Sequence, residues 1–248
     1  MTLRIYLTGN VTLEDGTTLV TERRFQRPQV RRAFAALVWH RDTGVSTDEL
    51  AEIVWDGRPP PAWPTALRAL VSRARSAIGE VAGIEQTFGT YRLRLPPDAW
   101  IDVQAAESAA HEAEVALREG ALEAAMGPAL VANAITRRPF LSGDTGEWCE
   151  RRREYLRGLR IRALEVRASV ALANADAVGA ATDAAVVVEL EPYRETAYAL
   201  LMKAHAAAGN PAQAVATYGA LRERLASDLG TQPSPETEAV FLDVLAGR

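Results

Sequence analysis

Apolar residues between Pro64 and Ile78 recur at the spacing of a helix with one buried face. The opposite side of this helix carries no acidic residue, because none occurs between Asp56 and Glu80. An outer face with guanidinium and hydroxyl groups but no carboxylate is suited to phosphate oxygens and base edges. The pattern predicts a DNA-contacting helix, with a merely solvated helix face as the alternative. The buried stripe is Leu67, Leu70, Val71, Ala74 and Ile78, and the outer face is Thr65, Arg68, Ser72, Arg73, Arg75 and Ser76.

Two further amphipathic helices are predicted ahead of this one. The first begins at Pro28 and ends near Gly44, and its apolar face is Val30, Ala33, Phe34, Leu37 and Val38. The second follows Ser46, whose side chain is expected to cap it while Glu49 completes a capping box. The segment 56–64 cannot continue this helix, because its four prolines stiffen it into a loop.

Alternation of apolar and polar residues predicts strands on both sides of the helices. Residues 3–7, 11–13 and 17–20 favour a small antiparallel sheet, and residues 23–25 a further short extended piece. After the third helix, residues 83–88 and 91–95 predict a β-hairpin with Gly89-Thr90 as its two-residue turn. The hairpin would present Arg92 and Arg94 outward, opposite Tyr91, Leu93 and Leu95. This order of elements is typical of a winged helix-turn-helix.

From Ile101 onward the pattern is helical, with breaks expected at glycines and prolines such as Gly127-Pro128. The chain also repeats weakly at a spacing of 34 residues, as stacked helix pairs of the tetratricopeptide (TPR) type do. The predicted fold has two domains. Residues 1–98 form an α+β winged helix-turn-helix with a small antiparallel sheet and a hairpin wing, and residues 99–248 form an all-α, TPR-like bundle. The repeat aligns Ala168, Ala171, Ala180 and Ala184 with Met202, His205, Ala214 and Tyr218.

Charge and composition change this picture only slightly. The chain has a net charge of −4, but residues 1–98 carry 13 arginines against 11 acidic residues, so the basic surface lies weakly in the front half. A single cysteine excludes an internal disulfide, and three widely spaced histidines lack metal-ligand spacing, so neither a metal nor a cofactor is expected. No apolar run is long enough to span a membrane, which predicts a cytoplasmic protein.

A set of segments follows in a specific order and spacing: 50–55, the Pro-rich loop, 67–73, 89–93, Ile101-Asp102, 191–196, 200–209, 212–225 and 229–237. Together they resemble the Streptomyces antibiotic regulatory protein (SARP) family. The resemblance implies an OmpR-type winged helix joined to a bacterial transcriptional activation domain. The chain departs from the family pattern at Ala74, where leucine is usual, and at Ser76, where a basic residue is usual.

The resemblance implies an activator of a biosynthetic gene cluster that binds direct repeats upstream of promoters and recruits RNA polymerase. A homodimer on DNA would place its recognition helices about 10 bp apart. The Pro-rich loop, with Asp56, Gly57, Arg58 and Trp63, is the candidate for touching polymerase, and a rigid spacer is the equal alternative. In this interpretation the helix residues Arg68, Ser72, Arg73 and Arg75 enter the major groove, Thr65 contacts phosphate and Ser76 lies beside them. Arg92 or Arg94 would reach the neighbouring minor groove or its backbone.

Other classes of function remain as alternatives. The acidic back half would also suit a protein-interaction module whose winged helix no longer reads DNA, or a ligand-responsive regulator with a pocket between helix pairs. An enzyme is disfavoured, because the only lysine, Lys203, lies in no phosphate-binding loop and no serine lies in a Gly-x-Ser-x-Gly turn. The sequence therefore predicts a non-enzymatic DNA-binding regulator.

Overall fold

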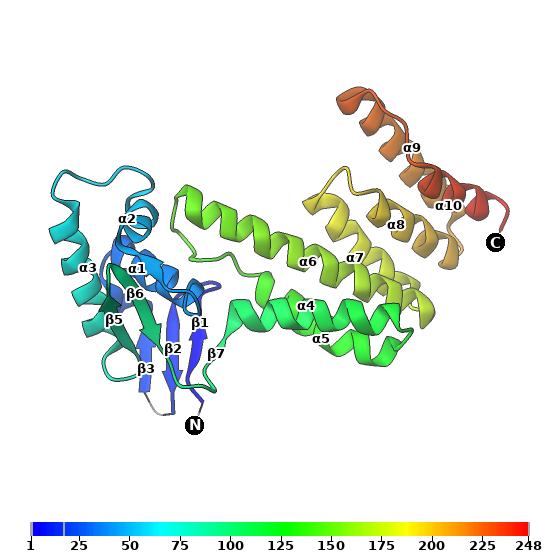
Figure 1. Ribbon diagram of the computed structural model, residues 1–248. Coiled ribbons are helices and arrows are strands. Elements are labelled where there is room, and N and C mark those ends of the chain that lie inside the picture. Colours follow the sequence, from blue (N-terminus) through cyan, green and yellow to red (C-terminus); the bar gives the residue numbers. More distant parts are fainter. Residues whose placement is uncertain (1, 17, 248) are drawn as a thin grey trace. The chain divides into compact units, whose positions relative to one another are not determined.

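The computed structural model describes residues 2–16 and 18–247, which form two compact units (Figure 1). The first unit combines the chain up to Ala105 with residues 135–156, and the second combines residues 106–134 with the chain from Arg157 onward. This division differs from the one drawn on the sequence, because residues 135–156 belong to the first unit. The domain boundary after Asp98 therefore stays a prediction.

The first unit begins with a four-stranded sheet in the order β3-β2-β1-β7. Strands β1 (Arg4–Tyr6), β2 (Thr12–Asp15) and β3 (Thr18–Thr21) are antiparallel neighbours, as predicted. Strand β7 (Trp100–Ile101) pairs parallel to β1, so the sheet is not purely antiparallel. A strand of two residues is too short to show a period of two, so its residue pattern could not predict it. Thr17, where the third strand was expected to begin, lies outside the described residues.

The extended piece predicted at residues 23–25 is wrong. Residues Glu22–Phe25 form a 3₁₀ helix, η1, between β3 and the first α-helix. Phe25 is almost fully buried, and its ring lies 5.1 Å from the ring of Phe34, centroid to centroid. One buried aromatic in four residues fits a helical turn as well as a strand, so the pattern could not separate the two.

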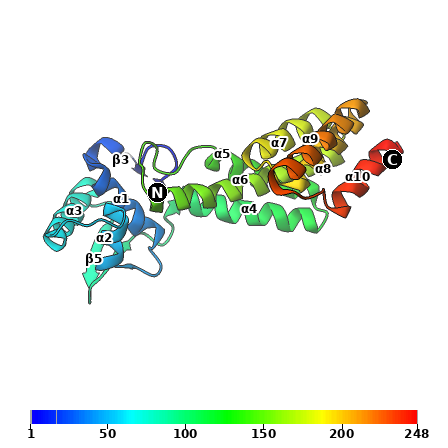
Figure 2. The same cartoon turned by 90° about the horizontal axis from the view of Figure 1, so that it is seen from above.

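Three helices pack beside the sheets: α1 (Pro28–Trp39), α2 (Thr47–Trp55) and α3 (Trp63–Ile78). The predicted cap is confirmed, because the Glu49 backbone N–H donates to Ser46 Oγ at 3.1 Å. Helix α1 ends at Trp39, earlier than predicted, and is buried along almost its whole length. In Figure 2, α3 lies at the outer edge of the first unit with α1 and α2 beside it.

The second sheet has the order β4-β6-β5 and contains the predicted hairpin, β5 (Gly83–Thr87) and β6 (Thr90–Arg94). Its turn is not Gly89-Thr90: Thr87 pairs with Thr90, so Phe88-Gly89 is the two-residue turn. Both turn residues have positive φ, 48° and 76°, as a type I′ turn requires. Glycine is the usual second residue of a type I′ turn, so Phe88 occupies the first position. Strand β4 (Val45–Ser46), which the sequence did not reveal, pairs with β6 and holds the hairpin to the helices.

Every element in the described part of the second unit is helical. The helices of the back half are α4 (Asp102–Arg118), α5 (Leu122–Thr136), α6 (Glu147–Ala173), α7 (Ala177–Leu190), α8 (Glu195–Ala207), α9 (Pro211–Leu229) and α10 (Pro235–Leu245). Successive helices α7, α8 and α9 pack against one another, which confirms the TPR-like bundle and the predicted fold class. The aligned repeat positions, except His205, are buried.

The break predicted at Gly127-Pro128 is wrong, because α5 continues through both residues. Proline removes one backbone hydrogen bond inside a helix. Ala125 and Ala129 on either side are fully buried against α4 and α6 residues, and this packing outweighs the local preference. No helix in the described part of the chain is long and apolar enough to cross a membrane.

Candidate nucleic-acid interface

Helix α3 presents all its predicted contact residues on its exposed side. Leu67, Val71 and Ala74 are fully buried in the first unit, so the opposite face of the helix is exposed to solvent. No side chain caps the helix at Ala62. The Trp63 N–H donates to the Pro60 carbonyl oxygen at 2.9 Å and Pro64 has no N–H, so the Thr65 N–H is the first-turn donor that suits a phosphate. The residues that the structure brings together on this face are Thr65, Arg68, Ser72, Arg73, Arg75 and Ser76.

Two of these residues already have partners within the first unit. The Arg75 guanidinium donates through Nε to the Ile84 carbonyl oxygen at 2.9 Å, so it ties α3 to strand β5. The Ser76 hydroxyl donates to the Ser72 carbonyl oxygen at 3.1 Å on its own helix. Both roles are structural in the free protein, and Arg75 in particular fixes the hairpin beside the helix.

The hairpin, called the wing below, faces as predicted. Tyr91 and Leu93 are buried, whereas Arg92 and Arg94 are exposed. Arg94 Nε lies 2.8 Å from Glu85 Oε2 on the neighbouring strand, which holds its charge on the sheet surface. Arg92 has no carboxylate partner among the described residues, so it is the more available cation of the two.

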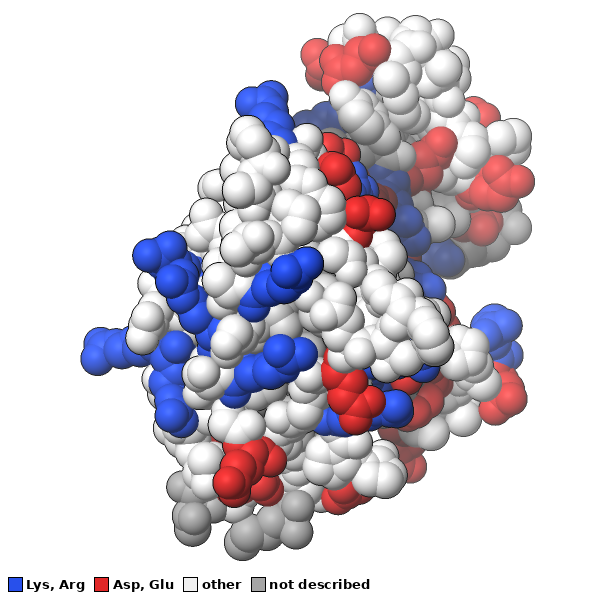
Figure 3. Space-filling model, turned by 60° about the vertical axis from the view of Figure 1, so that its left-hand side comes forward, with Lys and Arg blue, Asp and Glu red and all other residues white. Residues whose placement is uncertain are grey.

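Basic side chains gather on the side of the molecule that carries α3 (Figure 3). Within residues 2–16 and 18–247, neither Arg68 nor Arg73 forms an ion pair. Unpaired guanidinium groups on an exposed helix keep their full donor capacity for an outside acceptor. This face therefore has the charge and the hydrogen-bond donors that contact with a polyanion needs.

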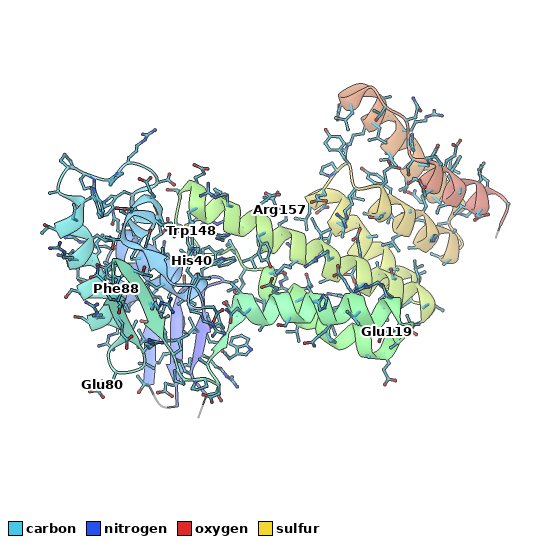
Figure 4. The ribbon with its side chains drawn as sticks, viewed as in Figure 1. His40, Glu80, Phe88, Glu119, Trp148 and Arg157 are labelled. Carbon is cyan, nitrogen blue, oxygen red and sulfur yellow. The ribbon has the colours of Figure 1, made fainter. Side chains whose placement is uncertain are left out.

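Phe88 at the tip of the wing escaped the sequence interpretation. Its side chain is fully exposed, and its φ of 48° is one that a bulky side chain rarely adopts (Figure 4). The signal was the Phe-Gly dipeptide between two alternating segments, where Asn-Gly is the common choice. Phe88 gives the wing an apolar tip at the cost of backbone strain.

We expect Phe88→Asn to stabilise the first unit by about 1 kcal/mol, because asparagine tolerates the left-handed conformation that costs other residues about 1–2 kcal/mol. Urea unfolding followed by tryptophan fluorescence measures the change. Phe88→Ala is the control, since it removes the ring and keeps a strained residue, so it should not stabilise. Destabilisation by Phe88→Asn would contradict the assignment of strain to this turn.

The Pro-rich loop between α2 and α3 is anchored at its beginning. Asp56 adopts a left-handed conformation, and its Oδ1 accepts the Glu147 backbone N–H at 2.7 Å, which caps α6. Gly57 and Arg58 are exposed, and Trp63 is half-buried at the start of α3. Arg58 is the one cation among the four predicted polymerase-contact residues, and its side chain is exposed. The Asp56 carboxylate is instead already bound to the Glu147 N–H.

A buried charge cluster, the Asp144 cluster, attaches residues 135–156 to α1. It consists of Arg31, Arg32 and Asp144, all of which are buried. Arg32 Nε donates to Asp144 Oδ1 at 3.1 Å, and Arg31 Nη2 to Asp144 Oδ2 at 3.3 Å. The sequence offered no signal for a pairing over more than a hundred residues. The cluster holds the segment that precedes α6 against α1.

Aromatic packing strengthens the same attachment. The ring of Trp39 at the end of α1 makes edge contacts with Phe140 and Trp148, at centroid distances of 5.6 and 6.5 Å. The Arg152 guanidinium lies 4.5 Å from the Trp39 ring centroid, where a cation and an aromatic face attract. Trp148 and His40 mark this region in Figure 4. These residues are therefore structural and not part of the exposed basic face.

Cys149, beside the Asp144 cluster, is expected to be unreactive in the native protein. Burial, together with the nearby Asp144 carboxylate, raises the pKa of its thiol to about 12, and only the thiolate reacts. Mass spectrometry after iodoacetamide treatment at pH 8 should find native protein unlabelled and urea-unfolded protein fully labelled. Rapid labelling of the native protein would show that the segment around Cys149 is open in solution.

No group of side chains in the described part of the chain has the composition of a metal site. A search of protein families matches residues 101–245 to the family described as "Bacterial transcriptional activator domain". The match covers more than half of the chain.

Curated relatives are regulatory proteins by name, and one of them is named as a transcriptional regulator. The regulatory protein AfsR of Streptomyces coelicolor is 29% identical over 221 residues, which cover 89% of this chain and 22% of AfsR. The transcriptional regulatory protein EmbR of Mycobacterium tuberculosis is 26% identical over 226 residues, which cover 86% of this chain and 56% of EmbR. The chain thus spans about a fifth of AfsR and about half of EmbR.

A solved structure has the same fold. It is that of Mycobacterium tuberculosis EmbR in complex with a low affinity phosphopeptide, and it matches this chain with a TM-score of 0.87 at 23% sequence identity. The match covers 99% of this chain and 65% of that one. At this identity, the likeness concerns the fold alone. It agrees with the winged-helix and helical arrangement described above.

Proposed function

Because the chain belongs to the bacterial transcriptional activator domain family, we propose that it regulates transcription by binding duplex DNA through its first unit. The resemblance to SARP regulators is confirmed by the family match and by the relatives named AfsR and EmbR. One observation carries the DNA-binding proposal. Helix α3 exposes Arg68 and Arg73, without carboxylate partners among the described residues, on a face that has no acid of its own.

In the proposed complex, α3 lies in the major groove and the wing lies over the adjacent backbone. Arg68 and Arg73 reach base edges, where a guanidinium forms paired hydrogen bonds with guanine O6 and N7. Ser72 and Thr65 bond phosphate or base edges nearby. Arg75 contributes by keeping the wing against α3, and Arg92 contacts the backbone or minor groove beside it.

The further steps follow from the family resemblance. The protein would work in the cytoplasm, bind direct repeats as a head-to-tail homodimer and place its α3 helices about 10 bp apart. The loop from Asp56 to Trp63 would touch RNA polymerase, with exposed Arg58 as its contacting cation. The target would be a biosynthetic gene cluster, as the resemblance to SARP regulators implies.

Selection from a random pool of duplexes, followed by fluorescence anisotropy on a recovered duplex and on its scrambled sequence, tests the proposal. We expect a preference for the recovered duplex of at least about 10³-fold, with affinity that falls steeply between about 50 and 200 mM salt. Failure to enrich any sequence, with weak and equal binding to all duplexes, would overturn the proposal. It would favour a protein-interaction module or a ligand-responsive regulator instead.

A further inference from the structure

A hollow beside α3 is lined by three arginines and no acid. It has a volume of about 410 Å³ and lies between η1 and the last turns of α3. Its polar lining consists of Arg23, Arg24 and Gln26 from η1 and its end, and Arg73 and Ser76 from α3. Phe25 and Ala77 supply the apolar part. Within the described residues, none of these three arginines pairs with a carboxylate, so the hollow concentrates positive charge.

The one acid of η1 is occupied elsewhere. Glu22 accepts the Val11 backbone N–H at 3.1 Å and forms an ion pair with buried Arg31. Glu22 therefore pairs with Arg31, and neither Arg23 nor Arg24 forms an ion pair with it. Phe25, packed on Phe34, anchors the short helix, so the two arginines project from a fixed backbone.

The backbone after η1 holds a rare conformation. Gln26 has φ 57° and ψ −35°, and the Arg27 N–H donates back to the Phe25 carbonyl oxygen at 2.6 Å. This is a γ-turn with positive φ, which costs energy in a residue other than glycine. The turn keeps Gln26 in the wall of the hollow.

The hollow and the wing lie on different flanks of α3. Each residue advances the helix by about 100°, so Arg73 and Ala77, two residues before and after Arg75, each lie about 160° around the axis from it. Arg75 bonds the wing at Ile84, whereas Arg73 and Ala77 line the hollow. A helix in the major groove has a sugar-phosphate backbone on either side. The wing covers one backbone, which leaves the hollow for the other.

We propose that the η1–α3 hollow binds phosphodiester groups of the DNA strand that flanks the major groove opposite the wing. This proposal rests on the proposed function. Arg23 and Arg24 contact the DNA backbone and do not read the base sequence. The protein therefore contacts the duplex through three elements: the wing, α3 and η1.

Salt dependence of binding by an Arg23→Ala/Arg24→Ala variant tests the proposal. Each phosphate contact contributes about 0.9 to the slope of log affinity against log salt, or about 5-fold in affinity at 0.15 M salt. We expect the variant to lose about 5- to 30-fold for the selected duplex and its scrambled sequence alike. Its slope should fall by about 1 to 2, with the ratio between the two duplexes unchanged.

Two further variants make the result specific. Arg137→Ala/Arg138→Ala removes two consecutive exposed arginines of the first unit that belong to neither η1 nor α3, and it should lower the slope by much less than 1. Arg23→Lys/Arg24→Lys keeps both charges and should keep most of the slope. Thermal unfolding confirms that each variant is folded.

Uncharged methylphosphonate linkages at the flanking phosphates locate the contact on the DNA. They should weaken DNA binding by the wild-type protein and leave DNA binding by the Arg23→Ala/Arg24→Ala variant unchanged. Equal weakening of both proteins, or an unchanged slope in the variant, would overturn the hollow as a phosphate site while the proposed function stands. A wild-type protein that binds no duplex would overturn both.

Discussion

Replacing Asp144 with alanine is expected to destabilise the first unit by about 3–5 kcal/mol, the loss that is typical when one partner of a buried ion pair is removed. The Asp144 side chain has no exposed surface and accepts from both Arg31 and Arg32. Its loss would leave these two guanidinium groups buried without their shared carboxylate. The contact between α1 and residues 135–156 would then contain two buried positive charges in place of a paired set, and it would lose the hydrogen bonds to Asp144.

Tryptophan fluorescence during urea unfolding measures this loss selectively, because all five tryptophans belong to the first unit. Asp42→Ala is the control. Its carboxylate is 79% exposed and lies 3.5 Å from Arg41 Nε, and such a surface pair contributes less than about 1 kcal/mol. A loss below about 1 kcal/mol for Asp144→Ala would show that the Asp144 cluster is not what joins residues 135–156 to the winged helix.

Replacing both Arg68 and Arg73 with alanine is expected to weaken binding to the selected duplex by at least about 100-fold. Each paired contact of arginine with guanine contributes about 1–3 kcal/mol of discrimination. The preference for the selected duplex over its scrambled sequence should therefore fall too. Arg75 is left intact, since its bond to Ile84 holds the wing and its removal would mix two effects.

Fluorescence anisotropy on both duplexes measures the result, with Arg137→Ala/Arg138→Ala as a control of equal charge change. That control should lose only a small factor, the same for each duplex, because it alters long-range attraction alone. If the α3 variant and the control lost affinity equally, with the preference intact, Arg68 and Arg73 would not read bases.

The sequence predicted what depends on neighbouring residues. Three examples are the apolar stripe of α3, the Ser46 cap and the alternation around Arg92. Each depends only on residues close together in the sequence, and all three are present in the structure. The positions of the candidate contact residues followed from the same periodicity. For this reason the sequence alone predicts which face of α3 is exposed.

What the sequence missed depends on distant residues or on very short elements. Strand β7 has two residues and is defined by its pairing with β1, about a hundred residues earlier. The Asp144 cluster likewise joins α1 to a segment whose local pattern says nothing about arginine partners. The 3₁₀ conformation of η1 hid the hollow beside α3, since a strand there would have pointed Arg23 and Arg24 to opposite faces.

Methylation interference on the selected duplex tests most directly whether α3 reads the major groove. Guanine N7 lies in that groove, and its methylation removes the acceptor that an arginine would use. We predict that methylation at one or more guanines blocks the wild-type protein, and that Arg68→Ala no longer distinguishes methylated from unmethylated DNA at one of them. Binding that is indifferent to every guanine N7, or a pattern identical in the wild type and Arg68→Ala, would contradict the account.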